Sequence, residues 1–166
     1  MSEADWEGRL AGAWASFDQY GEAEFLTLIE KLAAELPPDD PVGVFERACS
    51  LDSTGHSDRA VPLYREALDR GLTGERRRRA VIQLASSLRN IGKPEESVAL
   101  LRAEMEAGHD HLDDAVRAFL ALALVDVGHE REAVSLALGA LAPHLPRYQR
   151  SLANYARLLG SADAGE

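Results

Sequence analysis

The chain has 166 residues, and 46% of them are hydrophobic, which suits one ordinary folded domain or a short array of repeats. No run approaches the roughly 18 apolar residues of a membrane span, and the first residues lack the basic start of a secretory signal, so we expect a soluble, cytoplasmic protein without a membrane partner. The net charge of −10 argues against general nucleic-acid binding, and the single cysteine, Cys49, excludes an internal disulfide or a four-cysteine zinc site.

Charge is distributed unevenly along the chain. Residues 1–46 contain eleven acids and two bases, a net charge of −9, whereas residues 47–106 have a net charge of +2 and residues 107–166 one of −3. An anionic partner would therefore be repelled least by the middle of the chain.

Apolar residues recur at helical spacing throughout, as in Leu10, Trp14 and Phe17, and the alternation typical of strands is absent. Glycine and proline interrupt this pattern and divide it into helices of roughly 12–17 residues. The predicted helices are residues 3–19, 22–36, 41–54, 58–70, 75–91, 94–107, 111–127, 130–141 and 147–160. We therefore expect an all-α fold with short connections.

Three segments are similar to one another around a glycine. Each has alanine, then leucine three positions later, glycine at seven, a small residue at twelve and valine at thirteen. A weaker fourth copy surrounds Gly21. The alanine and glycine of the three clear copies are Ala48 and Gly55, Ala85 and Gly92, and Ala121 and Gly128. We expect each glycine to end one helix in a left-handed turn, and neighbouring helix pairs to stack on a continuous core.

This pattern of small residue, leucine, glycine, alanine, aromatic and alanine resembles the tetratricopeptide repeat. The copy that matches best has Ala48, Leu51, Gly55, Ala60, Tyr64 and Ala67 at these places. The chain from Pro41 to about Ala156 is similar to a bacterial family of such proteins, on two stretches in particular. These are Arg77-Arg78-Arg79-Ala80-Val81-Ile82-Gln83-Leu84-Ala85 and Leu141-Ala142-Pro143-His144-Leu145-Pro146-Arg147-Tyr148.

Some positions depart from the family pattern. Leu101 and Ala137 replace the aromatic residue of the second helix, Glu104 replaces its second alanine, and Trp14 occupies a small-residue position of the first copy.

The resemblance implies a right-handed α-solenoid of stacked antiparallel helix pairs, forming a single domain over residues 1–160. Its parts would be an N-terminal pair over 3–36, repeats over 41–70, 75–107 and 111–141, and a capping helix over 147–160. Residues 161–166 are expected to form a disordered tail.

In the family, the first helix of each pair lines a concave groove that binds a peptide or helix. Matching positions give this chain a groove with an apolar floor, a cationic and amide centre, and aspartates at its rim. The expected groove residues are Phe45, Asp52, Arg79, Ile82, Gln83, Ser86, Arg89, Asn90, Phe119, Leu122 and Asp126. An alternative is that Arg79 and Arg89 pair internally with Asp52 and Asp126.

Four arginines follow Glu75 at the start of a predicted helix, where their charges oppose the helix dipole. We expect most of them to be neutralised by carboxylates such as Asp58, Glu66 and Asp69, or by the acidic N-terminal third.

Residues suited to catalysis or metal binding are few. Cys49 and His56 are seven residues apart, or about 10 Å along a helix, which is too far for a nucleophile and its base. The run from His109 to Asp114 has metal-ligand types but also suits a helix cap. We therefore expect no catalytic residue, no metal and no cofactor.

The leading hypothesis is a non-catalytic scaffold that binds another protein or peptide in its groove. One alternative is a homodimer formed by the groove or an end surface, to which Trp6, Trp14 and Phe17 would contribute if exposed. Another is a small anionic ligand held by Arg79 and Arg89.

Overall fold

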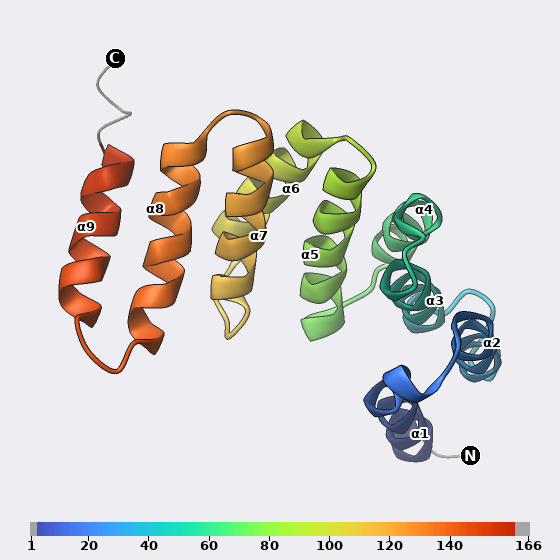
Figure 1. The fold of residues 1–166 in the computed structure, drawn as a ribbon. Helices are drawn as coiled ribbons and strands as arrows, with labels where there is room; N and C mark the ends of the chain where they lie inside the picture. The colour runs from blue at the N-terminus through green and yellow to red at the C-terminus, as the bar shows by residue number, and fades with distance from the viewer. Residues whose placement is uncertain (1–2, 162–166) are drawn as a thin grey trace. The chain divides into compact units, whose positions relative to one another are not determined.

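A computed structural model of the chain describes residues 3–161 (Figure 1). Over these residues it has α-helices, two short 3-10 helices and no strand, which confirms the all-α expectation. The chain divides into two compact units, residues 1–83 and 84–166, whose boundary lies within helix α5, Gly74–Asn90. The expectation of a single domain over residues 1–160 stays a prediction.

The first unit consists of successive antiparallel helices. These are α1 (Glu3–Ala15), the 3-10 turn η1 (Phe17–Gln19), α2 (Glu22–Ala33), α3 (Pro41–Ser53), α4 (Ser57–Asp69) and the first part of α5. Helix α1 packs against α2, α2 against α3, and α3 against α4. At the N-terminal end the core contains Trp6, Leu10, Phe25, Ile29 and Leu32, so the predicted N-terminal pair has an apolar interior of its own.

The second unit continues the same arrangement. It contains the rest of α5, then α6 (Pro94–Ala107), α7 (Asp113–Asp126), α8 (Glu130–Leu141), the 3-10 turn η2 (Ala142–His144) and α9 (Gln149–Ser161). Helix α7 packs against α6 and α8, and α9 packs along α8 and η2. The hydroxyl of Ser135 donates to the carbonyl of Ala156 at 2.7 Å, and Nε of Arg131 donates to the carbonyl of Leu159 at 3.1 Å. These bonds fix the register of α9 on α8.

The turn glycines have the predicted conformation. Gly92 has φ +78°, where a side chain would be strained, and the next backbone N–H donates to the carbonyl of Leu88 at 2.9 Å. The other two copies have the same bond. The backbone N–H groups of His56 and His129 donate to the carbonyls of Leu51 and Leu124, each at 2.9 Å. The structure thus confirms that one capping motif ends the first helix of every clear repeat.

Two predicted helices end three or more residues earlier than expected. Helix α1 ends at Ala15, not at residue 19, and a separate 3-10 turn follows it. Helix α2 ends at Ala33, because Glu35 and Leu36 donate to carbonyls three residues back and a proline follows at position 37.

Two other helices start later than expected. Helix α7 begins at Asp113, not at residue 111, because Asp110 accepts the backbone N–H of Leu112 at 2.7 Å and holds a turn there. Helix α9 begins at Gln149, not at residue 147, because Tyr148 has a φ of +67°. Ser161, expected in the tail, is the last residue of α9, and residues 162–166 lie outside the described part of the chain. No helix of the described residues is both long and apolar enough to cross a bilayer.

Candidate functional site

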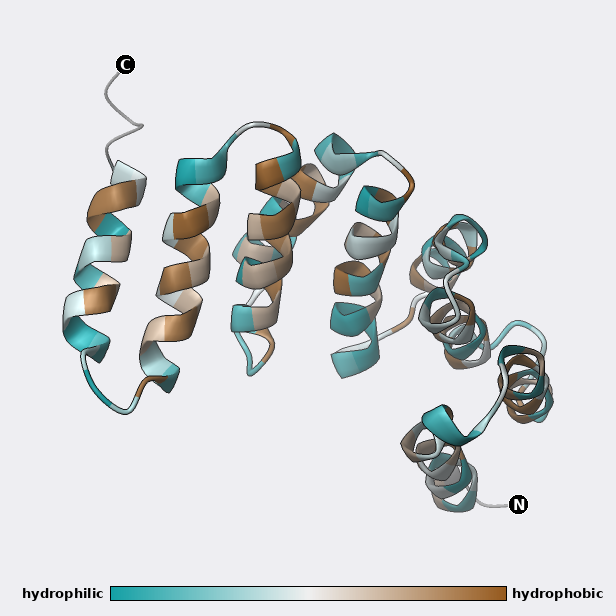
Figure 2. Ribbon diagram, in the orientation of Figure 1, coloured by the Kyte–Doolittle hydropathy of each residue, from teal (hydrophilic) through white to brown (hydrophobic). Residues whose placement is uncertain are grey.

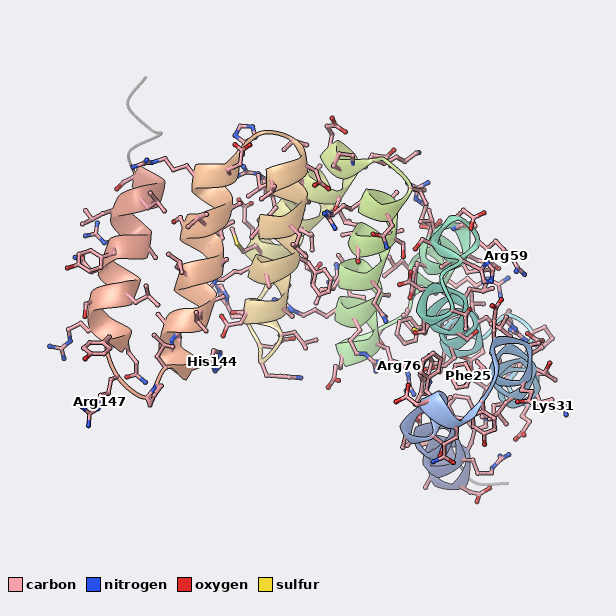
Figure 3. The ribbon with its side chains drawn as sticks, viewed as in Figure 1. Phe25, Lys31, Arg59, Arg76, His144 and Arg147 are labelled. Atoms are coloured by element: carbon pink, nitrogen blue, oxygen red, sulfur yellow. The ribbon has the colours of Figure 1, made fainter. Side chains whose placement is uncertain are left out.

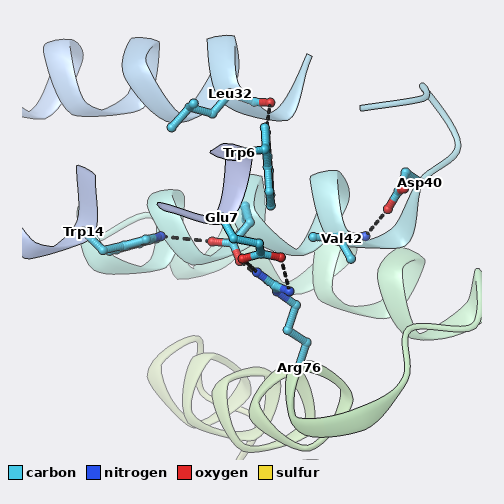
Figure 4. A network of polar contacts seen from close by, with 8 residues as sticks. Trp6, Glu7, Trp14, Leu32, Asp40, Val42 and Arg76 are labelled. Atoms are coloured by element: carbon cyan, nitrogen blue, oxygen red, sulfur yellow. Dashed lines mark hydrogen bonds and ion pairs between the residues drawn. The ribbon is translucent and has the colours of Figure 1, made fainter. Parts of the chain in front are cut away.

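The arginine run at the start of α5 is neutralised in part by the acidic N-terminal third, as one of the expectations stated. Arg76 binds Glu7 through both terminal nitrogens, at 2.9 and 2.7 Å, and its Nε donates to Glu46 at 3.3 Å (Figure 4). Glu66, one of the partners expected from the sequence, instead forms an ion pair with Arg70 at 2.5 Å. The contact joins α1, α3 and α5 within the first unit.

Glu46 is the buried member of this cluster. It is 2% exposed, and Nε1 of Trp14 donates to its other oxygen at 3.0 Å. Burial raises the pKa of Glu46, while the hydrogen bonds from Trp14 and Arg76 oppose that rise. The cluster therefore connects α1 and α3 to the start of α5, and it engages all three side-chain nitrogens of Arg76.

The aromatic residues expected for self-association belong to the N-terminal core. Trp6 is 4% exposed and donates to the carbonyl of Leu32 at 2.8 Å, and Trp14 and Phe17 pack around Phe25. Trp6 is therefore not exposed and does not meet the condition on which its contribution to a dimer surface depended.

Arg79 is exposed, and its guanidinium lies 5.5 Å from the centre of the Phe45 ring. Within the described part of the first unit, no carboxylate forms an ion pair with Arg79. Asp52, its expected internal partner, accepts hydrogen bonds from Ser57 at 3.0 Å and Tyr64 at 3.4 Å. Arg79 therefore covers an aromatic ring and remains accessible to a ligand.

The other groove residues of the first unit are mostly covered. Phe45 is fully buried, Ile82 is 6% exposed, and the half-buried Gln83 accepts the thiol of Cys49 at 3.4 Å. Phe45 and Ile82 are thus buried, and Arg79, whose guanidinium lies over the Phe45 ring, is exposed.

In the second unit the structure confirms an internal pairing for Arg89. Its Nε lies 2.6 Å from Asp126, the partner that the sequence suggested. Ser86 and Phe119 are half-buried, and Asn90 is exposed. Leu122 is 48% exposed and is the member of the predicted set that lines an apolar hollow.

That hollow is a groove of about 380 Å³ between α7 and α8, and every residue that lines it is apolar. Figure 2 shows hydrophobic bands on both helices. The lining residues are Ala118, Ala121, Leu122, Val125, Ala133, Val134 and Ala137. Hereafter we call it the α7–α8 groove. The groove residues predicted from the sequence do not include this α8 side, where Ala137 departs from the aromatic residue of the family pattern.

This groove is open because small residues of the third repeat stand where the first repeat has aromatic rings. In the first clear repeat, Phe45 and Tyr64 are both fully buried, with ring centres 6.2 Å apart. The equivalent positions of the third repeat, counted from the shared alanine, are Ala118 and Ala137. Two alanines thus replace two aromatic rings, and no other side chain of α7 or α8 fills the space.

A second hollow lies in the first unit, between α2, α3 and α4. It measures about 460 Å³, and three cations line it, Lys31, Arg47 and Arg59, two of them labelled in Figure 3. Arg47 is held by Glu30 at 2.7 Å. The hollow is open, and three leucines line it beside the charged side chains, without a buried donor set for a particular ligand.

The chemical candidates from the sequence have structural roles. Burial raises the pKa of Cys49, which makes its thiol a poor nucleophile, and His56 binds Glu22 at 2.6 Å. His109 binds Asp113 at 2.9 Å at the start of α7, as a helix cap would. Over residues 3–161 no cluster of His, Cys, Asp and Glu is arranged to hold a metal ion.

The repeat positions and helix pairs agree with a comparison to known families. A family model described as tetratrico peptide repeat matches residues 41–159, which is most of the chain. The chain belongs to the tetratricopeptide repeat family. No curated protein matches its sequence.

Among solved structures, this tetratricopeptide repeat protein is similar to a variant of nearly identical TPR-like repeats of a putative kinesin light chain from Podosopora anserina. The two share 16% identity, the match covers 100% of each chain, and the TM-score is 0.69. At this identity the match shows the fold alone, which is an all-α solenoid. Its right-handed course stays a prediction. Tetratricopeptide repeats generally mediate interactions between proteins.

Proposed function

We propose that this chain is a non-catalytic interaction module that binds a peptide or helix of a protein at the α7–α8 groove. The observation that supports the proposal most is the groove itself, a hollow of about 380 Å³ with an apolar lining in a chain of which 28% is charged. Leu122, expected to contact a ligand, lies in it.

The chemistry of the groove favours a protein segment over a small metabolite. Sites for small molecules combine an apolar wall with a few polar groups that orient the ligand, and this groove has no polar lining residue. A peptide or helix needs only bulky apolar side chains to insert between α7 and α8. Such side chains would occupy the space that Phe45 and Tyr64 fill in the first repeat.

The alternative of a small anion bound by Arg79 and Arg89 has less support. Asp126 already neutralises Arg89 at 2.6 Å, so an anion would have to displace a carboxylate. Arg79 alone offers one exposed cation. The proposal includes a cytoplasmic location and no membrane partner. The net charge of −10 argues against a nucleic-acid partner.

A selection from a random peptide library displayed on phage tests the proposal. We expect enriched peptides with bulky apolar residues, bound with dissociation constants of roughly 1–100 μM, as is common for short motifs of small contact area. The variant Leu122→Asp should weaken binding at least about tenfold in fluorescence anisotropy, because a peptide would bury its charge. Peptides that bind wild type and variant equally would contradict the assignment to this groove.

A further inference from the structure

The α7–α8 groove is part of a larger apolar surface that extends onto α9. Ser135 faces α9, because its hydroxyl binds the carbonyl of Ala156. Adjacent residues of a helix are separated by about 100°, so Val134 lies a quarter-turn to one side of Ser135 and Tyr155 a quarter-turn from Ala156. Because α8 and α9 run antiparallel (Figure 1), Val134 and Tyr155 point to the same side of this helix pair.

We define the apolar face as the α7–α8 groove together with the exposed apolar side chains beside it. On α8 the face includes Leu141, and on α9 it includes Tyr155, with Leu158 at its edge. The exposed fractions are 48% for Leu122, 48% for Val125, 45% for Val134, 48% for Leu141, 66% for Tyr155 and 49% for Leu158.

The size of the apolar face is that of a stable protein interface. Its six exposed side chains are each 45–66% exposed and together present several hundred Å², the scale of the roughly 800 Å² that each partner contributes to a standard interface. Monomers rarely expose an apolar patch beyond a few hundred Å². The residues that define the face are all uncharged, so two copies of it can meet without like charges opposing one another.

The face is also complementary to itself. It has a hollow, where Ala118 and Ala137 line the α7–α8 groove, and a projecting aromatic side chain, Tyr155, on the neighbouring α9. A two-fold axis that lies in this face and runs along α8 exchanges the α9 side with the α7 side, because α8 packs against both helices. It brings the projection of each copy over the hollow of the other and makes the same contact twice. A ring in the hollow would restore the packing that Phe45 and Tyr64 have within the first repeat.

We propose that the chain forms a two-fold dimer in which Tyr155 of each copy fills the α7–α8 groove of the other. This inference rests on the proposed function, since it names a second copy as the protein that the groove binds. The interface is apolar while each chain has a net charge of −10, so salt screens the repulsion between copies and strengthens the dimer.

Sedimentation velocity of the full chain over a range of concentrations and salt tests the dimer. We expect the mass of two chains at tens of micromolar, with tighter association at higher salt. Leu122→Asp in the groove and Tyr155→Asp on α9 should each weaken association at least about tenfold, because each buries a charge in an apolar contact. Tyr20→Asp is the matched control, since Tyr20 is 41% exposed in the first unit, and it should leave the mass unchanged.

Mixing the two variants distinguishes this arrangement from other dimers. A mixed pair of Leu122→Asp and Tyr155→Asp has one contact with both residues intact, so the mixture should associate more tightly than either variant alone. Circular dichroism must show equal helix content in all variants. A wild type that stays monomeric at about 200 μM, or variants that dimerise like wild type, would overturn the proposal. If the dimer proposal fails, peptide binding by the wild type that is lost in Leu122→Asp would still support the proposed function. If the wild type binds no peptide either, both proposals fail.

Discussion

The indole nitrogen of Trp14 donates a 3.0 Å hydrogen bond to Glu46, a carboxyl that is 2% exposed. Arg76 contacts the second oxygen of the same carboxyl and binds Glu7 of α1. One buried group thus connects the N-terminal helix pair to α3 and to the start of α5.

Removing the indole donor should destabilise the chain. Trp14→Phe keeps most of the packing against Phe25 but leaves one oxygen of Glu46 without its donor, which costs about 1–3 kcal/mol for a buried polar group. Urea denaturation followed by circular dichroism measures the change. Tyr20→Phe is the control and should change stability by less than about 0.5 kcal/mol. Equal midpoints for Trp14→Phe and wild type would mean that this bond contributes nothing.

The pH dependence of stability should contain a contribution from Glu46. Its pKa in the folded chain is raised above the ordinary value of 4.5, mainly by burial, so the folded state binds this proton more readily than the unfolded state. The contribution of Glu46 to stability therefore grows as pH falls from above the folded pKa towards 4.5, and declines as pH rises through the same window.

The variant Glu46→Gln isolates that contribution, because other groups titrate in the same range. The difference in unfolding free energy, wild type minus variant, should increase as the pH is lowered from 7 towards 4.5. Glu35, whose pKa is lowered by its hydrogen bond to Arg9, acts in the opposite direction but cancels in the difference. A difference that is flat, or that decreases on acidification, would show that Glu46 is not held in a proton-favouring environment.

The turn after α5, the first helix of the second clear repeat, should depend on glycine. Gly92→Val should lower the free energy of unfolding by more than about 1 kcal/mol, because φ is +78°. No neighbouring atom lies near enough to add a clash, so the loss comes from the backbone alone. Gly12→Ala in α1, equally free of close neighbours, should instead stabilise by about 0.5–1 kcal/mol, since alanine favours a helix. Thermal unfolding compares the two, and the same sign for both would contradict the backbone argument.

The pair of Arg89 and Asp126 should contribute little to stability and should oppose anion binding. Both side chains are about one-third exposed, so a double-mutant cycle with alanine should give a coupling below about 1 kcal/mol. Asp126→Asn frees Arg89, and in isothermal titration it should strengthen the binding of inorganic phosphate if any occurs. Phosphate binding that is tight in wild type and unaffected by Asp126→Asn would favour the small-anion hypothesis at another site.

Local features of the chain could be predicted from the amino-acid sequence. The glycines at 55, 92 and 128 end helices because a left-handed turn is a property of the residue and its nearest neighbours. The repeated spacing of alanine, leucine and glycine also predicted the helix pairs and the family, because it too depends on residues close together in the chain. Errors occurred at helix ends, where Asp110 and Tyr148 form turns that depend on side-chain bonds or an unusual φ.

The tertiary structure decided which side chains remain accessible and which residues meet. Arg76 and Glu7 are 69 positions apart, and no local pattern specifies that a cation of α5 binds α1. Phe45 and Leu122 both belonged to the expected groove, yet Phe45 is buried beneath Arg79 while Leu122 borders an open hollow. The hollow exists because Ala118 and Ala137 are small at the same height of two packed helices. Packing depends on such pairs of side chains across an interface, whereas the sequence determines each residue's place in its own helix.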